Sequence, residues 1–223
     1  EATRFYNENE VGFGKMLDLS CGKGAEIIRM SDFENAEAFY DYIKEKGFGV
    51  VEEYLINHDK IREVYEPALN TMRMITIIGD DNEPHLFFAA QKFGVNGRFI
   101  DVHGIHAPID LETGIVHFPF HSGNTDTDLI YTKHPDTGYD LTNYEVPMFK
   151  EAKEMILRAA MKVPEMRYVG WDVAVTNKGP KIVEGNDYTA YDYMQLPHQN
   201  PSRIGVIPDI LKLVPSFKDE LYK

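Results

Sequence analysis

The chain has 223 residues, of which 43% are hydrophobic and 26% are charged, as expected for one large globular domain or two small lobes. Its formal net charge of −13 argues against non-specific binding to nucleic acid or anionic membranes. No apolar run approaches the ~18 residues that cross a bilayer, so no membrane insertion is expected. The single cysteine, Cys21, excludes an intrachain disulfide and predicts a reducing, cytoplasmic setting.

The first quarter of the chain predicts a small lobe at residues 1–55. Residues 11–17 and 26–30 have strand character and flank the loop Ser20-Cys21-Gly22-Lys23-Gly24, so they predict a hairpin with a glycine-rich tip. A helix is expected over residues 32–46, with Ser31 as N-cap and Gly47 after its end. A strand is expected to follow at residues 50–56.

The remaining residues, 56–223, predict a larger lobe. Its expected elements are a short helix at 59–65, strands at 72–78 and 85–93, an irregular segment at 94–144, a helix at 147–162, strands at 168–176 and 181–184, and helical pieces within 204–222. This order predicts an α+β fold of two layered lobes. Nucleotide sites favour the junction of such lobes.

Three oxygen-bearing side chains are predicted to share one face of a hairpin near the end of the chain. Asp172 lies on the first strand, and Glu184 and Asn186 lie at the end of the second. Side chains two residues apart on a strand point to the same face, and hairpin pairing can bring Asp172 beside them. Such a set suits a hard divalent cation such as Mg²⁺. On spacing alone, an exposed hairpin with solvated acids is an equally good reading.

Two earlier segments have weaker signals. Lys15 precedes the Gly22-Lys23-Gly24 loop, whose glycines allow backbone N–H groups to approach phosphate oxygens. The spacing is not that of a Walker A loop, and an ordinary hairpin turn with a solvated lysine is the default reading. Residues 50–55 change from apolar to acidic, which suits the edge of an adenine ring. In isolation, an edge strand with solvated glutamates is again the default.

The order of these segments resembles the ATP-grasp superfamily from about residue 11 to residue 186. Local strings are more closely similar to the sugar-transfer-associated ATP-grasp family, relatives of the α-L-glutamate ligases. The matching strings are Asn57-His58, Asn70-Thr71-Met72-Arg73, Asp110-Leu111-Glu112-Thr113-Gly114, His134-Pro135-Asp136-Thr137-Gly138, Val169-Gly170-Trp171-Asp172 and Glu184-Gly185-Asn186. The resemblance implies an ATP-grasp fold, with the nucleotide held between two antiparallel sheets.

The resemblance also implies a nucleotide site. Lys15 is expected to hold the α- and β-phosphates, beneath a mobile loop. His58 or Asp59 is expected near the ribose. The further residues expected to bind ATP are Ser20, Gly22, Lys23 and Gly24 in the loop, and Glu52, Glu53, Tyr54 and Leu55 at the adenine hinge.

Catalytic, metal and acceptor roles follow from the same resemblance. Arg73 is expected to face the transferred phosphoryl group. Lys92 occupies a position where relatives often carry arginine, and with Lys15 and Arg73 it completes the catalytic set. Asp172, Glu184 and Asn186 are expected to bind Mg²⁺, as two ions. His134 and Asn70 are expected near the acceptor substrate.

The implied activity is that of an ATP- and Mg²⁺-dependent ligase. It would activate a small-molecule, glycan or peptide carboxylate as an acyl phosphate for attack by an amine, in a cell-envelope or polysaccharide context. An ATP-grasp phosphotransferase without ligation and a non-catalytic nucleotide-binding domain are the alternatives. The intact Lys15, Arg73 and Asp172 argue against the non-catalytic alternative.

Two further features of the sequence need explanation. ATP-grasp proteins normally carry an additional region ahead of the Lys15 strand, whereas only about ten residues precede that strand here, so a fragment or a minimal form is expected. The pairs His103/His106 and His117/His121 have spacings that can bind zinc. They lie in the irregular segment without a cysteine partner, so solvated or substrate-contacting histidines are favoured.

Overall fold

The computed structural model describes the chain except residues 18–23, 102, 125–126, 190–191, 197–203 and 219–223. The chain divides into two compact units, Glu1–Ile56 and Asn57–Lys223. No helix among the described residues combines the length and the apolar character needed to cross a membrane.

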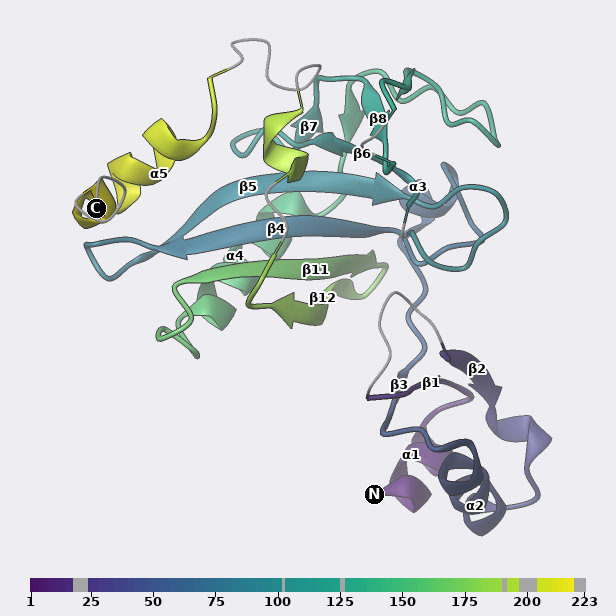
Figure 1. The fold of residues 1–223 in the computed structure, drawn as a ribbon. Helices are drawn as coiled ribbons and strands as arrows, with labels where there is room; N and C mark the ends of the chain where they lie inside the picture. The colour runs from purple at the N-terminus through teal and green to yellow at the C-terminus, as the bar shows by residue number, and fades with distance from the viewer. Residues whose placement is uncertain (18–23, 102, 125–126, 190–191, 197–203, 219–223) are drawn as a thin grey trace. The chain divides into compact units, whose positions relative to one another are not determined.

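The first unit is a three-stranded antiparallel sheet with helices (Figure 1). The strand order is β2-β1-β3, so the hairpin predicted from the sequence is confirmed and the following strand pairs with its first arm. The elements are α1 (Ala2–Glu8), β1 (Val11–Lys15), β2 (Glu26–Arg29), the 3₁₀ turn η1 (Met30–Asp32), α2 (Ala36–Lys46) and β3 (Val50–Glu53).

The helix α2 begins later than the sequence predicts. Asn35 is its N-cap, and the side chain of Asn35 accepts hydrogen bonds from the backbone N–H groups of Glu37 and Ala38. Ser31 lies in the preceding 3₁₀ turn, so its prediction as the cap was wrong. Asparagine and serine cap helices about equally well, and pattern alone does not choose between them. The predicted end at Gly47 is confirmed: Gly47 adopts φ 75°, a left-handed conformation that favours glycine.

A small aromatic core holds the first unit together. Phe39 of α2 is buried and packs against Phe5, Tyr6 and Phe33. Gly14 of β1 lies against two further core residues, because a Cβ atom there would lie 2.9 Å from the side chains of Ile28 and Phe48. Glycine at this position therefore brings the sheet close to its hydrophobic neighbours.

The second unit is built on a seven-stranded antiparallel sheet of order β12-β11-β4-β5-β6-β8-β9 (Figure 1). Its strands are β4 (Thr71–Ile78), β5 (Pro84–Phe93), β6 (Ile105–Pro108), β8 (Phe120–Ser122), β9 (Ile130–Tyr131), β11 (Tyr168–Thr176) and β12 (Gly179–Asn186). A second, two-stranded sheet pairs β7 (Ile115–Val116) with β10 (Tyr144–Glu145). The helical elements are α3 (Asp59–Arg62), α4 (Phe149–Ala160), the 3₁₀ turn η2 (Asp192–Gln195), α5 (Ile207–Leu213) and the 3₁₀ turn η3 (Pro215–Phe217).

The segment 94–144 was expected to be irregular, and that prediction was too coarse. It contains the strands β6 to β10, each two to four residues long. Such short strands show too few alternations for a periodicity to be recognised. Of these, β6, β8 and β9 extend the main sheet beyond β5, and His106 of β6 pairs in register with Lys92.

The helix α4 covers one face of the main sheet. Its buried residues Ala152 and Ile156 join a core that includes Met74, Ala89 and Val173. The opposite face carries the charged residues of β4, β5 and β11. The C-terminal segment is attached to the β4–β5 turn, where the Asp80 backbone N–H donates to the Leu213 carbonyl oxygen (2.9 Å). The Asp80 carboxylate also accepts from the Ser216 backbone N–H (2.8 Å).

Candidate nucleotide and metal site

The charged face of the second unit is centred on Asp172. Its Oδ1 atom lies 3.1 Å from Arg73 Nε and 3.1 Å from Lys92 Nζ. Its Oδ2 atom accepts a hydrogen bond from Arg73 Nη2 (3.2 Å). Asp172 and Lys92 are only 7% and 8% exposed, so these charges interact through a medium that screens them less than water does.

Strand register explains why these residues meet. Arg73 of β4 lies directly opposite Asp172 of β11, and Thr71 lies two residues before Arg73 on the same face. Because β4 and β5 are antiparallel with Arg73 opposite Ala90, Lys92 lies on that face beside Thr71. Three strands that are separated in sequence thus place two cations and one carboxylate together.

Lys92 has a second carboxylate partner that the sequence did not reveal. Asp101 Oδ1 lies 3.3 Å from Lys92 Nζ. Burial alone would lower the pKa of the Lys92 ammonium, but Asp101 and Asp172 outweigh it and raise the pKa above its ordinary value. Asp101 belongs to no matching string and to no regular element, so nothing in the sequence distinguished it.

Glu184 and Asn186 lie on β12 beside Asp172. Asp172 is opposite Glu184, and a β-bulge follows, because Val173 is opposite Ile182. The side chains of Glu184 and Asn186 approach each other, with Asn186 Nδ2 3.4 Å from Glu184 Oε1. The structure thus brings the three predicted metal ligands to neighbouring positions of one hairpin, and Glu184 is solvent-exposed.

These side chains suit Mg²⁺. Two carboxylates and an amide supply the hard oxygen atoms that Mg²⁺ prefers, and Mg²⁺ characteristically takes its other ligands from phosphate and water. Among the described residues, no three His, Cys, Asp or Glu side chains form a group that could hold a metal. A metal at Asp172 and Glu184 would therefore need the Asn186 amide, together with phosphate or water, to complete its coordination.

Thr189 gives Arg73 a further contact. Arg73 Nη1 donates to Thr189 Oγ1 (3.0 Å), and Thr189 is buried. The close approach of Thr189 requires glycine at position 170, because a Cβ atom there would lie 2.2 Å from Thr189 Oγ1. Gly170 was recognised from the sequence only as part of a matching string.

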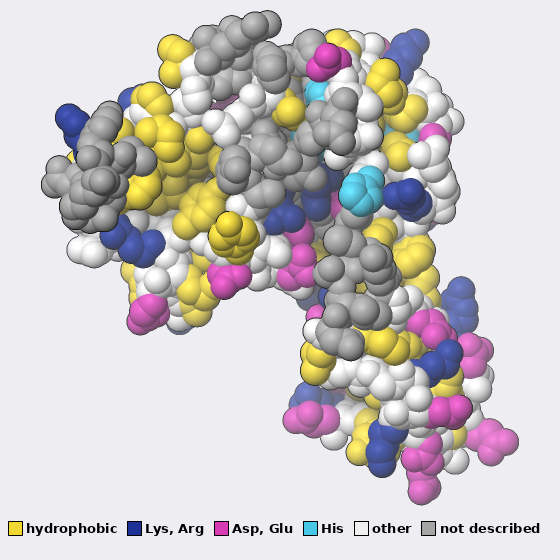
Figure 2. All heavy atoms as spheres, viewed as in Figure 1, with side chains coloured by type: hydrophobic (Ala, Val, Ile, Leu, Met, Phe, Trp, Pro, Cys, Tyr) yellow, Lys and Arg dark blue, Asp and Glu magenta, His cyan; other side chains and the backbone are white. Residues whose placement is uncertain are grey.

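The first unit contributes its own ion pair. Lys15 Nζ lies 2.5 Å from Glu52 Oε2, and both residues project from one face of the β1–β3 pair. Of the loop residues predicted to bind phosphate, Gly24 is described, in a left-handed turn at φ 67°. Ser20, Gly22 and Lys23 lie outside the described residues, as does Cys21. On the viewed face of this unit, basic and acidic side chains are interspersed (Figure 2).

The predicted hinge ends its strand earlier than expected. The strand β3 stops at Glu53, so Tyr54 and Leu55 follow it without regular pairing. His58 caps α3, where its Nδ1 atom accepts from the Lys60 backbone N–H (3.2 Å). Asp59 Oδ1 accepts a hydrogen bond from Asn177 Nδ2 (3.1 Å), which connects α3 to the β11–β12 turn.

Asn70 is buried in an amide network. Its Nδ2 donates to the carbonyl oxygens of Tyr65 (2.6 Å) and Ala68 (3.1 Å), and its Oδ1 accepts from the Gly94 backbone N–H (2.9 Å). The Asn70 backbone N–H donates to Asn57 Oδ1 (2.7 Å). These contacts give Asn70 a structural role, and its assignment to substrate stays a prediction without support from them.

His134 is likewise fixed by its surroundings. It is 1% exposed and stacks on Tyr65 with ring centroids 4.8 Å apart. Its Nε2 atom bonds the Gly94 carbonyl oxygen (2.9 Å), and its Nδ1 atom faces the backbone N–H groups of Asp136 and Thr137. Burial lowers the pKa of His134, so the neutral ring matches one donor and one acceptor nitrogen. Both ring nitrogens are therefore engaged by backbone groups, and the assignment of His134 to substrate stays a prediction.

A buried histidine pair lies beside Lys92. His106 is opposite Lys92 on β5 and opposite His121 on β8, and the two histidine rings have centroids 5.9 Å apart. Burial, followed by the charges of His121 and Lys92, lowers the pKa of His106 to about 3. His106 is therefore neutral at physiological pH.

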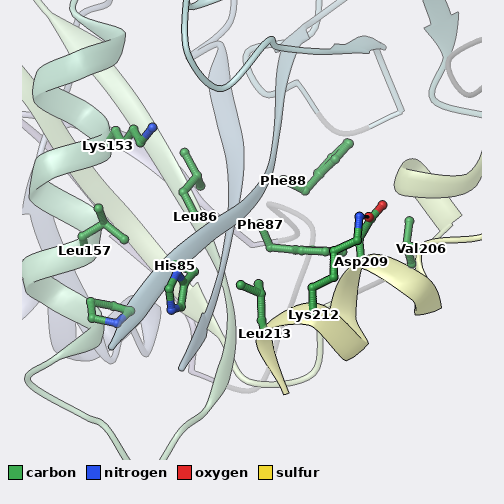
Figure 3. A pocket seen from close by; sticks show the side chains of 11 residues that line it. His85, Leu86, Phe87, Phe88, Lys153, Leu157, Val206, Asp209, Lys212 and Leu213 are labelled. Atoms are coloured by element: carbon green, nitrogen blue, oxygen red, sulfur yellow. Dashed lines mark hydrogen bonds and ion pairs between the residues drawn. The ribbon is translucent and has the colours of Figure 1, made fainter. Parts of the chain in front are cut away.

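A separate pocket lies between β5, α4 and α5 (Figure 3). Leu86, Phe88, Leu157 and Leu213 give it apolar walls. Its charged residues already have partners: Lys153 bonds the Leu111 carbonyl oxygen (3.0 Å), and Lys212 pairs with Asp209 (2.5 Å). None of the residues predicted to bind nucleotide, metal or substrate lines this pocket.

A model of the sugar-transfer associated ATP-grasp family matches residues 22–203. The chain belongs to this ATP-grasp family. Its α+β fold is therefore the ATP-grasp fold, as the sequence predicted, and the matched range contains Arg73, Lys92, Asp172, Glu184 and Asn186. Nothing among the curated proteins matches the chain.

Two solved structures are similar to this ATP-grasp chain. Both are of the ATP-grasp ligase PsnB, one complexed with a minimal precursor, Mg and ADP, and the other with the precursor peptide PsnA2 and AMPPNP. Each is 16% identical, with a TM-score of 0.43, over 84% of this chain. The chain spans 41% of the length of the PsnB chains.

Proposed function

We propose that this chain carries the nucleotide and metal site of an ATP- and Mg²⁺-dependent ligase that activates a carboxylate for attack by an amine. The observation that carries the proposal is the cluster on one face of the main sheet, where Asp172 lies between Arg73 and Lys92 and next to Glu184 and Asn186. Membership of the ATP-grasp family supports it.

In this proposal, Asp172, Glu184 and Asn186 would hold Mg²⁺, as two ions, and the bound metal would offset the negative charge of the phosphates. Arg73 and Lys92 contribute fixed positive charges in a site that excludes much of the solvent, so they stabilise charge that develops on the transferred phosphoryl group. No covalent nucleophile from the chain is required, because the acceptor carboxylate attacks the γ-phosphate, ADP leaves and an acyl phosphate forms. The amine then displaces phosphate from the acyl carbon.

Nucleotide-binding roles are also proposed for residues of the first unit, taken by itself. Lys15, now paired with Glu52, would exchange that carboxylate for the α- and β-phosphates. Glu52, Glu53, Tyr54 and Leu55 would contact adenine as the hinge, and His58 or Asp59 would lie near the ribose. Ser20, Gly22, Lys23 and Gly24 stay predicted contacts of the phosphates.

A phosphotransferase that uses the same site without ligation is the second candidate function, because Arg73, Lys92 and the metal ligands would serve both reactions. A hydroxylamine trap distinguishes them. The chain is incubated with ATP, Mg²⁺, hydroxylamine and a panel of amino acid, peptide and uronic acid carboxylates. A ligase is expected to form a hydroxamate with its own carboxylate, since hydroxylamine captures an acyl phosphate.

The Arg73→Met variant is the control, because it removes the cation that faces the phosphoryl group. ADP release without hydroxamate would favour the phosphotransferase. Equal, background ADP release by the wild-type and the variant chain would contradict both enzymatic proposals. The acceptor class, including a cell-envelope or polysaccharide carboxylate, would be read from whichever member of the panel is trapped.

A further inference from the structure

The Lys92 ammonium is shared between two buried carboxylates. Lys92 Nζ lies 3.1 Å from Asp172 Oδ1 and 3.3 Å from Asp101 Oδ1. All three residues are at most 8% exposed. Removing one partner of a buried ion pair leaves a charge without compensation, which is costly. With two carboxylates present, Lys92 has a partner even when one of them is engaged elsewhere.

Asp101 is held rigidly by its other contacts. Its Oδ2 atom accepts hydrogen bonds from both the backbone N–H and the hydroxyl of Thr71, each 2.7 Å long. Its backbone oxygen accepts from the Gly104 N–H (3.0 Å). Glycine at position 104 is required, because a Cβ atom there would lie 1.9 Å from the Phe93 carbonyl oxygen. The carboxylate is thus fixed to β4 through Thr71 and held close to β5.

The Asp172 carboxylate is a partner of two cationic side chains and also a proposed metal ligand. The proposed function, on which this inference rests, makes Asp172 a metal ligand, yet Arg73 and Lys92 occupy its oxygens in this structure. A lysine whose only partner was Asp172 would compete with the metal for that carboxylate. Asp101 removes part of this competition, since it offers Lys92 a second, preformed partner.

We propose that Asp101 is a positioning residue, which retains the Lys92 ammonium at the edge of the site when Asp172 binds the metal. Asp101 contacts Lys92, Thr71 and Gly104, and acts on the metal only through Lys92. The Asp101 carboxylate lowers the cost of separating Lys92 from Asp172, and it keeps a positive charge where the phosphoryl group would lie.

The test is a double-mutant cycle on metal affinity, which isolates the coupling between two residues. Mn²⁺ serves as the probe, and free Mn²⁺ is measured by electron paramagnetic resonance in the presence of saturating ADP. The chains are the wild type, Asp101→Asn, Lys92→Met and the double variant. Asp101→Asn is expected to weaken Mn²⁺ binding about tenfold, whereas the same change in the Lys92→Met background should alter it less than about twofold.

Two further variants complete the design. Asp110→Asn is the control for loss of a carboxylate bonded to threonine: Asp110 accepts from the backbone N–H and hydroxyl of Thr113, as Asp101 does from Thr71, but it is exposed and pairs with no lysine among the described residues, so wild-type affinity is expected. Asp101→Glu keeps the charge and is expected to restore affinity to within about threefold of the wild type. Fluorescence of Trp171 checks that each variant is folded.

Each possible result either supports or overturns the positioning role of Asp101. A tenfold loss that persists in the Lys92→Met background would show a general charge effect and overturn the inference. Wild-type affinity in a folded Asp101→Asn chain would overturn it as well, while leaving the proposed function intact. If the wild-type chain binds no Mn²⁺ with ADP, the proposed function falls and the inference falls with it.

Discussion

At the scale of residues, the two carboxylates Asp172 and Glu184 differ in burial and therefore in their contribution to stability. Asp172 is buried and its oxygens are engaged by Arg73 and Lys92, whereas Glu184 is exposed and accepts a hydrogen bond from the Asn186 amide. A buried carboxylate between two cations contributes to local structure as well as to a site. An exposed carboxylate contributes little to stability, so changes at Glu184 separate function from folding.

Glu184→Gln is therefore expected to abolish ATP turnover while leaving the free energy of unfolding within about 0.5 kcal/mol of the wild type. The substitution keeps the shape of the side chain and removes the charge that would bind Mg²⁺. ADP release measures turnover, and urea unfolding followed by Trp171 fluorescence measures stability. Glu154→Gln, an exposed change on α4, is the control. Normal turnover by Glu184→Gln would show that the metal assignment is wrong.

His106 makes the stability of the second unit depend on pH. Its pKa is lowered from 6.5 to about 3 in the folded chain, so the unfolded chain binds more protons between these values. Stability is full above pH 6.5 and falls as the pH decreases toward 3. Between pH 6.5 and 4.5, the wild type should lose about 2 kcal/mol more than His106→Gln, whose side chain does not titrate.

Urea unfolding of both chains at the two pH values, followed by Trp171 fluorescence, checks this prediction. The comparison between chains cancels the contribution of the many carboxylates that both share. Parallel losses of stability in the two chains would show that His106 does not remain neutral in the folded state.

At the scale of elements, the buried amides Asn57 and Asn70 join three segments of the second unit. Asn57 Nδ2 donates to the Asn70 carbonyl oxygen (2.9 Å), and Asn70 bonds the segment before β4 and the residue after β5. The sequence marked both asparagines because they occur in matching strings. Their contacts explain them as connections between elements.

Asn70→Ala is expected to lower the free energy of unfolding by about 3 kcal/mol, because several buried backbone groups lose their partner. The KM for substrates should stay unchanged in the protein that remains folded. Denaturation and steady-state kinetics measure the two quantities. A raised KM with unchanged stability would instead support the prediction that Asn70 contacts substrate.

The elements that could be predicted from the sequence are those with strong hydrophobic periodicity or with turn and capping residues at their ends. The hairpin before α2, the end of α2 at Gly47 and the paired strands around Asp172 belong to this class. The short strands between β5 and α4 depend on long-range pairing, which leaves little local pattern. Asp101 was missed for the same reason, since its contacts with Thr71 of β4 and Lys92 of β5 are tertiary and leave no local pattern.

At the scale of the whole molecule, the two units differ in their hydrophobic cores. The first unit buries Ile28, Met30, Phe39 and Phe48, and these four residues form its core with partly buried neighbours. The second unit has a much larger core around its seven-stranded sheet. Small domains bury a smaller fraction of their surface and are less stable.

We therefore expect the first unit to unfold at lower denaturant concentration than the second. Trp171 is the only tryptophan of the chain and lies in the second unit, so its fluorescence reports that unit alone. Circular dichroism, which reports both units, should show an earlier transition that Trp171 fluorescence lacks. Coincident transitions by the two probes would contradict independent unfolding.

The Phe39→Ala variant tests whether the two units unfold independently. It should destabilise the first unit by about 3 to 5 kcal/mol and leave the Trp171 transition unchanged. The matched change Phe93→Ala, at a buried phenylalanine of the second unit, should shift the Trp171 transition instead. A shift of that transition by both variants would show that the units unfold together.

The β-bulge between β11 and β12 also bears on how this hairpin tolerates changes in length. On β12, Ile182 is opposite Val173 and Glu184 is opposite Asp172, so Val183 is the additional residue. Loss of a single codon for Val183 would leave a regular ladder in which Glu184 still faces Asp172. Loss of a codon on the other side of Glu184 would change which face Asn186 occupies. Descendants of this gene that differ in length here should therefore carry deletions at Val183 far more often than between Glu184 and Asn186.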